Sequence, residues 1–333
     1  AMLGTLRRLA VSQRQAVRCM STLPAKRARD SWTFMSEIVG NTALAGKGKL
    51  ISAGEILKLM DLAAVCSAIV HVGHGRLNTL AFDRMDFFAP LYHGDHVHID
   101  SRVAHVGKTS VCVHCMGRKK DILSRGWIHT HEAIIVFVAL GKDGKAVPAP
   151  ELICETEEEK NFSEMVMRRQ ELGKVYTKEQ NGFTLDSLAS FEHDMDSDND
   201  KRFRESIEME DTALRLRKIF MPRNLNGLGT IFGGDLLHWM ETAASACGSQ
   251  FLRNPAATTV AMDRVFFHRP VRPDELADLT ARVVRCSDET VQVETEVRVL
   301  RPFLRGTTEP AELVTHTGIF EVLNATDNGY RRP

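Results

Sequence analysis

The sequence predicts an α+β fold of two tandem domains, in which each domain is an antiparallel sheet wrapped around one long central helix. Three observations support this prediction: an internal repeat, one long apolar helix in each copy of the repeat, and a series of strand-like runs after each helix. A length of 333 residues suits two domains of ordinary size. Hydrophobic residues at 43% and charged residues at 26% are typical of soluble globular proteins.

An internal repeat with an offset of 180 residues runs in one register from about residue 53 to residue 111. Ala81-Phe82-Asp83-Arg84 in the first copy matches Ala261-Met262-Asp263-Arg264 in the second, and half of the residues at 81–90 are identical to those at 261–270. Because only two copies occur, at a long period, the repeat indicates a duplicated domain and not a solenoid.

Each copy contains a helix that is apolar on nearly all sides, at residues 54–70 and 234–250. A helix of this kind is buried. An earlier strand precedes it, and runs rich in β-branched residues follow it. This arrangement predicts the hotdog fold, with strands at residues 78–88, 96–106, 109–118 and 127–139 and at residues 258–268, 276–286, 290–300 and 312–323.

The first 30 residues differ from the rest of the chain. Seven Lys and Arg residues and no acid occur before Asp30, with apolar residues at helical spacing among them. A basic amphipathic helix without acids is typical of a mitochondrial transit peptide. We therefore expect residues 1–30 to be a targeting segment, cleaved after about residue 22, and the protein to lie in the mitochondrial matrix. A disordered basic tail is the alternative.

We place the two hotdog domains at residues 31–150 and 206–325, and a linker at residues 151–205. The linker is expected to contain a charged surface helix at Glu155–Glu171 and an acidic stretch. Alternating aspartates at 194–200, with an acid at 205, resemble a calcium-binding loop. Asn199 stands where such a loop needs glycine, so a solvated linker is the preferred interpretation.

The composition argues against several kinds of partner. Lys+Arg and Asp+Glu are both 43, so no net charge attracts nucleic acid, and no apolar run reaches the ~18 residues of a membrane span. Seven cysteines, scattered through apolar segments, fit buried free thiols in a reducing compartment. We expect no metal at Cys112 and Cys115, which face opposite sides of a strand, or at His96 and His98, which lack further ligands.

A glycine-rich loop, from Asn226 to Gly234, leads directly into the second apolar helix. Glycines at a helix start allow a ligand to approach the backbone and leave N–H groups free to bind negative charge. The spacing differs from that of a dinucleotide-binding loop. A plain glycine turn before a helix is the alternative.

Asp61 and Glu241 each lie two turns inside an otherwise apolar helix, seven residues after Gly54 and Gly234 respectively. An unpaired carboxylate in such a place costs several kcal/mol, so both acids are candidate functional residues. Polar residues three and six positions before each acid leave a polar stripe on a partly exposed helix as the alternative.

The chain resembles the mitochondrial acyl-CoA thioesterases with tandem hotdog domains, over about residues 31–325. Three motifs carry the resemblance: Phe232-Gly233-Gly234-Asp235-Leu236-Leu237 at a helix start, His105-Val106-Gly107-Lys108-Thr109-Ser110 at a strand turn, and Pro148-Ala149-Pro150-Glu151-Leu152 with the acidic run after it. The resemblance implies that the two helices pack antiparallel and that the domains form two composite clefts. A working cleft combines an Asn of one domain with an Asp on the helix of the other.

Transferred residue by residue, the resemblance makes Asn226 the Asn and Asp61 the Asp of one complete cleft. The other cleft would combine Glu241 with Gly46, which has no side chain, and Ala53 replaces its first glycine. We therefore expect one competent and one degenerate cleft.

For the competent cleft, the resemblance implies hydrolysis of acyl-CoA thioesters to free fatty acid and CoA. Asp61 would act as general base on a water, with direct attack by its carboxylate as the alternative. Asn226 would position the water or the carbonyl, and backbone N–H groups around Gly233 and Gly234 would polarise the thioester oxygen. Lys108-Thr109-Ser110 would contact the CoA phosphates. We expect no cofactor besides the coenzyme A of the substrate, and a homo-oligomer, namely a trimer of double-hotdog chains.

Two other functions stay open. A catalytically inactive hotdog protein would serve as a structural or assembly subunit of a mitochondrial complex, in line with the degenerate copy. A hotdog hydratase acting on enoyl thioesters is less well supported, because neither copy has a histidine at the position of Asn226.

Overall fold

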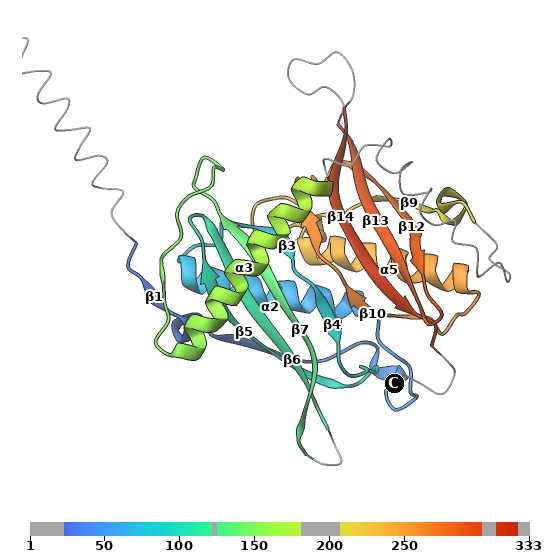
Figure 1. The fold of residues 1–333 in the computed structure, drawn as a ribbon, viewed down its shortest axis with the longest axis horizontal. Helices are drawn as coiled ribbons and strands as arrows, with labels where there is room; N and C mark the ends of the chain where they lie inside the picture. Colours follow the sequence, from blue (N-terminus) through green and yellow to red (C-terminus); the bar gives the residue numbers. More distant parts are fainter. Residues whose placement is uncertain (1–22, 122–124, 181–206, 302–310, 326–333) are drawn as a thin grey trace, which may run out of the picture.

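A computed structural model of the chain describes residues 23–121, 125–180, 207–301 and 311–325 (Figure 1). Each half of the chain forms one long helix packed on an antiparallel sheet. The two sheets join at their edges, and the two long helices lie side by side (Figure 1).

The N-terminal half is built around helix α2 (Ala53–Val72). The Ser52 hydroxyl caps its start by accepting a hydrogen bond from the backbone N–H of Gly54 at 3.2 Å. Gly73 ends it at φ +86°, a left-handed conformation that favours glycine. The strands of this half are β2 (Thr33–Ile38), β3 (Leu77–Phe82), β4 (Met85–Phe87), β5 (His96–Val106), β6 (Ser110–Lys120) and β7 (Trp127–Ala139), with β1 (Lys26–Arg27) and β8 (Leu152–Ile153) paired separately.

The C-terminal half repeats this arrangement around helix α5 (Gly233–Leu252). The helices and strands expected from the repeat are observed within a few residues of their predicted ranges, and the predicted runs 78–88 and 258–268 are each broken into two strands. The strands of this half are β9 (Leu214–Ile219), β10 (Thr258–Met262), β11 (Val265–Phe267), β12 (Leu276–Cys286), β13 (Thr290–Arg301) and β14 (Ala311–Leu323).

The described strands form a 12-stranded sheet in the order β2-β5-β6-β7-β3-β11-β14-β13-β12-β9, with β4 and β10 off this path. The halves are joined where β3 pairs with β11, through Ala81 opposite Phe266, and where β4 pairs with β10. The β3–β7 ladder shifts register between Thr79 and Ala81, so Leu80 is a β-bulge residue at the end of this junction.

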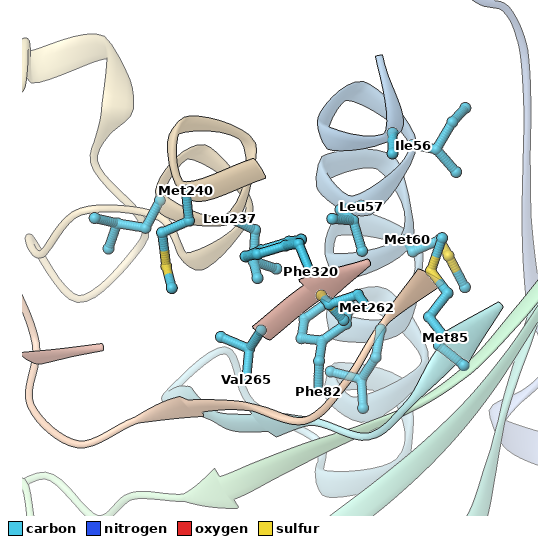
Figure 2. Packing of buried hydrophobic residues seen from close by; sticks show 14 of the residues in the cluster. Ile56, Leu57, Met60, Phe82, Met85, Leu237, Met240, Met262, Val265 and Phe320 are labelled. Atoms are coloured by element: carbon cyan, nitrogen blue, oxygen red, sulfur yellow. The ribbon is translucent and has the colours of Figure 1, made fainter. Parts of the chain in front are cut away.

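Helices α2 and α5 pack against each other in antiparallel orientation. Gly54, at the start of α2, lies beside His238 in α5, and Gly234, at the start of α5, lies beside Lys58 in α2. Burying each large apolar side chain contributes ~1.5–3 kcal/mol, so a core shared by both halves holds one half against the other. Fully buried members of this core (Figure 2) include Leu57, Met60, Phe82, Leu237, Met240 and Phe320.

The charged helix expected between the halves is α3 (Glu157–Gln180), which continues beyond its predicted end at Glu171. It crosses β5, β6 and β7 on the face turned away from α2 (Figure 1). Val166 packs there with Phe162 onto Cys112 and Ile134, in a cluster separate from the main core. Because its apolar side is docked on the sheet, α3 is solvated on one side only.

Two of the sequence predictions fall outside the described residues: the targeting segment up to about residue 22, and the acidic stretch at 194–205. All six cysteines of the described ranges are free. The expectation of buried thiols is wrong for Cys66 in α2 and Cys286 at the end of β12, whose positions face solvent. Among the described helices, none combines the length and the hydropathy that a membrane span requires.

Candidate active site

The start of α5 lies directly against the side chain of Asp61. A Cβ atom placed on Gly233 would lie 3.0 Å from Oδ2 of Asp61 and 3.0 Å from Cε1 of Phe267. A Cβ atom on Gly234 would lie 3.0 Å from the Cα atom of Lys58. The glycine pair therefore lets α5 approach both α2 and the carboxylate. A glycine turn that only changed the chain direction would not need this close packing.

The carboxylate of Asp61 is completely buried. Its Oδ1 accepts a hydrogen bond from the Thr79 hydroxyl at 3.2 Å, and its Oδ2 has no hydrogen-bond partner among the described residues. Burial raises the pKa of Asp61 to about 7, the Thr79 hydroxyl and the backbone N–H of Gly234 oppose this increase, and the charge of Asp235 adds to it. A carboxyl group with a pKa near 7 can take up and release a proton at neutral pH.

A cavity of about 240 Å³, which we call the Asp61 cleft, opens between the two halves of the molecule. Its walls come from α2, β3 and β7 of the N-terminal half, and from the loop before α5, α5 itself, β11 and β14 of the C-terminal half. Thr79 and Gly233 line the cleft and adjoin Asp61, which lies behind them. The carboxylate is thus one layer of atoms away from the space that a substrate would fill.

The structure places Asn226 in the wall of the Asp61 cleft. Its Oδ1 accepts hydrogen bonds from the backbone N–H groups of Leu228 and Thr230, at 2.9 and 3.2 Å, and its Nδ2 donates to the Thr230 hydroxyl at 3.0 Å. These bonds fold the loop back on itself, with Gly229 at φ +75° in the turn. Since an amide nitrogen carries two hydrogens, a second N–H of Asn226 is left to donate into the cleft.

The equivalent acid of the C-terminal half, Glu241, has a different environment. Its Oε2 accepts hydrogen bonds from the Ser52 hydroxyl at 2.6 Å and from the backbone N–H of Gly54 at 3.1 Å. Its Oε1 accepts a hydrogen bond from the Thr259 hydroxyl at 2.7 Å. The expectation of an unpaired carboxylate is therefore wrong for Glu241, because both of its oxygens have donors.

The cavity beside Glu241, which we call the Glu241 cleft, measures about 20 Å³ and has space for about one water molecule. Gly46, which takes the place of Asn226 in the repeat, lies exposed in a turn at φ +72°. Apart from Gly46 and its two chain neighbours, no atom of the described residues lies within 4 Å of the position that its Cβ would occupy, and Gly46 is not among the residues that line this cleft.

The polar stripes of the two helices face each other. Nζ of Lys58 in α2 lies 2.6 Å from Oδ1 of Asp235 in α5. Asp61 lies about one turn beyond Lys58 in α2, and Glu241 lies almost two turns beyond Asp235 in α5, both at buried positions. The polar stripe predicted from periodicity exists, but it forms an interface between helices and not a solvent-exposed face.

Lys108, Thr109 and Ser110 form the turn between β5 and β6 and lie outside the lining of the Asp61 cleft. Lys108 is exposed, the carbonyl of Thr109 accepts a hydrogen bond from the N–H of Ala139 at 3.0 Å, and Ser110 lines a separate cavity beneath α3. The predicted catalytic residues Asp61, Asn226 and Gly234 therefore meet around the Asp61 cleft, whereas the turn at Lys108 lies away from it.

Three residues at the site were not predicted from the sequence, namely Thr79, Phe267 and His316. The 180-residue offset pairs Thr79 with Thr259, so the repeat contained a signal for the hydroxyl that bonds to each acid. His316 packs edge-on against Phe267 with ring centroids 4.7 Å apart, and burial lowers its pKa to about 3, which keeps it neutral. In the N-terminal half His131 pairs with Phe87 as His316 pairs with Phe267. The two histidines are not separated by the 180 residues of the repeat, so the repeat gave no signal for them.

No group of three or more His, Cys, Asp or Glu side chains that could hold a metal ion occurs in the described part of the chain. Cys112 packs beneath α3, whereas Cys115 lies in the main core on the opposite face of the sheet. His96 and His98 each form a hydrogen bond with a neighbouring side chain on the outer face.

A family model described as the thioesterase superfamily matches two regions of the chain, residues 48–124 and 228–301. The two regions start 180 residues apart, in the register of the internal repeat, and each contains one long helix and the strands after it. The predicted tandem hotdog arrangement is confirmed.

Acyl-coenzyme A thioesterase 11 of Mus musculus is 26% identical over 300 residues, which are 90% of this chain and 48% of that protein. A Bacillus subtilis protein named as an uncharacterized acyl-CoA thioester hydrolase, YkhA, is 32% identical over 106 residues, which are 32% of this chain and 61% of that protein. The chain thus spans about half to three fifths of the length of these relatives.

A crystal structure described as an oleoyl thioesterase of Lactobacillus plantarum superimposes with a TM-score of 0.54 at 10% identity. The match covers 90% of this chain and 99% of that one. At this level of identity the similarity supports the double-domain fold alone.

Proposed function

The chain carries two domains of the thioesterase superfamily, and we propose that it hydrolyses acyl-CoA thioesters to a free fatty acid and CoA. One observation carries the proposal: the buried Asp61, with a pKa of about 7, adjoins a helix start and a cleft between the two domains. The names of the relatives support acyl-CoA as the class of substrate.

In the proposed reaction Asp61 acts as the general base. The ionised carboxylate takes a proton from a water molecule, the water oxygen attacks the carbonyl carbon of the thioester, and the C–S bond breaks. The proton then passes to the leaving sulfur, so the products are a carboxylic acid and the thiol of CoA. Thr79 holds Oδ1 in place, which leaves Oδ2 to bind the water.

The start of α5 supplies electrostatic stabilisation. The N-terminus of a helix carries partial positive charge, and N–H groups fixed there stabilise the negative oxygen that develops during attack on a carbonyl. The backbone N–H groups at the start of α5 and the second amide N–H of Asn226 are the donors that we assign to this oxygen. Gly233 contributes by having no side chain where the thioester approaches.

Two basic regions are candidates for binding the phosphates of CoA. Arg269 lies at the rim of the Asp61 cleft and is exposed. Lys108 lies with Thr109 and Ser110 in the turn between β5 and β6, away from the cleft lining. We favour Arg269, because it borders the cleft itself. We propose that the turn contacts at most the nucleotide part of CoA, which lies farthest from the thioester. The reaction uses water and no cofactor besides the coenzyme A of the substrate.

The test is thiol release by the purified chain from acyl-CoAs between acetyl- and palmitoyl-CoA. Because Cys66 and Cys286 are exposed and react with thiol reagents, the rate without substrate is subtracted. Release by the wild type and its loss in Asp61→Asn would support the proposal. A folded wild type that releases no thiol at any chain length would favour the inactive structural subunit.

We also propose that the protein lies in the mitochondrial matrix and forms a homo-oligomer. The basic, acid-free stretch before Asp30 supports the location. A fluorescent protein fused to residues 1–29 should enter mitochondria, and retention in the cytosol would contradict the location.

Light scattering tests the oligomeric state and should give the mass of three chains if the trimer is correct.

A further inference from the structure

A second and larger cavity lies beneath α3, on the face of the sheet turned away from α2. Its volume is about 350 Å³, which is in the range of small-molecule pockets. Ile134 and Val136 of β7 form its floor, Val166 of α3 belongs to its roof, and Phe266 of the other half forms one side. We call it the α3 cavity. Its roof has no counterpart in the described part of the C-terminal half, where no helix follows β14 up to residue 325.

The lining of the α3 cavity suits an apolar chain. Its two charged residues, Asp83 and Arg264, form an ion pair at 2.8 Å, so the cavity offers little net charge to an anionic group. Of its polar residues, Gln170 donates a hydrogen bond to the sulfur of Cys112. The rest of the surface is mainly aliphatic or aromatic.

Leu80 lies at the boundary between the α3 cavity and the Asp61 cleft. It lines both, it is the bulge residue at the end of the β3–β11 junction, and it is 39% exposed. It directly follows Thr79, whose hydroxyl bonds to Asp61. On the other side of the junction, Phe266 faces the α3 cavity and Phe267 faces the cleft, because successive residues of a strand point to opposite faces. A chain that starts beside Asp61 would have to pass Leu80 to reach the α3 cavity.

We propose that the α3 cavity binds the distal part of a long fatty acyl chain whose thioester lies in the Asp61 cleft, an inference that rests on the proposed function. Short acyl groups end inside the cleft, whereas longer chains pass Leu80 and bury their last methylenes between α3 and β7. Each buried methylene favours binding about fourfold. The α3 cavity therefore makes the site prefer long chains, with the CoA phosphates on the other side of the thioester, near Arg269.

The test compares kcat/KM of full-length variants for butyryl-, octanoyl-, dodecanoyl- and palmitoyl-CoA. Gln170→Trp fills the α3 cavity and Leu80→Phe narrows the passage, both at partly exposed positions that accept a larger side chain. We expect each to lower kcat/KM for palmitoyl-CoA at least tenfold relative to that for butyryl-CoA. Gln170→Trp, which lies outside the Asp61 cleft, should also keep the value for butyryl-CoA within threefold. Leu172→Trp, on the opposite and 54% exposed side of α3, is the matched control and should leave the whole profile unchanged.

Binding of free palmitate, measured by calorimetry, gives an answer that does not depend on turnover. Gln170→Trp should weaken it at least tenfold, and Leu172→Trp should not. An unchanged chain-length profile in both cavity variants would overturn the inference, as would a wild type that hydrolyses butyryl-CoA alone. An equal loss at all chain lengths, with weaker inhibition by free CoA, would assign the cavity to the CoA arm instead. Failure of the wild type to hydrolyse any acyl-CoA would reject the proposed function itself, and the inference with it.

Discussion

The Asp61 cleft and the Glu241 cleft are built from corresponding parts of one duplicated sequence, yet only the first has space for a ligand. Asp61 keeps one oxygen without a hydrogen-bond donor beside a cavity of about 240 Å³. Glu241 bonds to Ser52, Gly54 and Thr259 beside a cavity of about 20 Å³. The acid with unsatisfied hydrogen bonds therefore adjoins the open cleft, and the satisfied acid adjoins the closed one.

Two sequence differences between the halves explain this contrast. Ser52, before α2, offers a hydroxyl to Glu241, whereas its counterpart before α5 is Phe232, which has none to offer Asp61. Glutamate is one methylene longer than aspartate, so its carboxylate reaches both the hydroxyl and the N–H of Gly54. A buried acid becomes a structural group when donors surround it, and it stays available for chemistry when they do not.

Turnover should separate the two clefts most strongly. Asp61→Asn removes the proposed base and keeps the shape of the side chain, so kcat should fall about 100- to 10,000-fold. Asn226→Ala should also remove most turnover, whereas Glu241→Gln, the matched change in the other cleft, should leave kcat within a few-fold. Thiol release from acyl-CoA measures all three. Equal losses for Asp61→Asn and Glu241→Gln would show that both clefts work, and loss with Glu241→Gln alone would reverse their roles.

The pH dependence should report the Asp61 cleft alone. Because the pKa of Asp61 is about 7 and the reaction needs its ionised form, kcat/KM should rise about tenfold per pH unit below 7 and level off above it. At a pKa of about 7 the ionised fraction, and with it kcat/KM, should rise about 50-fold between pH 5 and pH 7. Initial rates at low substrate concentration measure it. A midpoint near the ordinary aspartate value of 3.8 would contradict the assignment of Asp61 as the base.

Stability should respond most to a change at Glu241. Glu241→Ala leaves the hydroxyls of Ser52 and Thr259 without their acceptor and takes one of two acceptors from the N–H of Gly54. At about 1–3 kcal/mol for each buried group left unpaired, the free energy of unfolding should fall by a few kcal/mol. Asp61→Ala takes the acceptor from the Thr79 hydroxyl and the neighbouring N–H of Gly234, but it also removes a buried charge, so its effect should be smaller. Urea unfolding compares the two variants. Equal decreases in the free energy of unfolding would mean that hydrogen-bond donors hold Asp61 as firmly as they hold Glu241.

The free energy of unfolding of the protein should depend on pH in the opposite direction from its activity. Between pH 3.8 and about 7 the folded state keeps a proton on Asp61 that the unfolded state has released. The folded state therefore loses stability as pH rises through this range, and no further above it. Asp61→Asn removes this loss, so its melting temperature relative to the wild type should be higher at pH 8 than at pH 5. A difference that does not change with pH would show that Asp61 is ionised throughout.

The smallest effect on activity is expected when the threonine hydroxyl that bonds to each acid is removed. Thr79→Val removes a hydrogen bond that lowers the pKa of Asp61, so the midpoint of the pH–rate profile should move upward. At pH 7 kcat/KM should fall a few-fold, and at pH 9 it should be nearly that of the wild type. Thr259→Val is the matched control in the Glu241 cleft and should leave the midpoint in place. A midpoint that stays unchanged in Thr79→Val would show that this bond does not tune the base.

The sequence by itself determined the fold and the positions of the two acids. Periodicity and β-branched content are properties of neighbouring residues, so they located the strands at 96–106, 127–139 and 276–286 with the bounds that the structure shows. The 180-residue repeat showed that the helices of the two halves are equivalent. The loss of the asparagine at Gly46 pointed to the asymmetry of the clefts before any geometry was known.

Only the tertiary structure decided which acid is satisfied. Asp61 and Glu241 look alike along the chain, since each follows a glycine by seven residues inside an apolar helix. The donor that distinguishes them, Ser52, lies 189 residues from Glu241 and reaches it only because α2 and α5 pack antiparallel. The α3 cavity likewise depends on a helix docked across strands from both halves. Hydrogen bonds and cavities depend on tenths of an ångström between distant segments, whereas periodicity depends only on residues that are close in sequence.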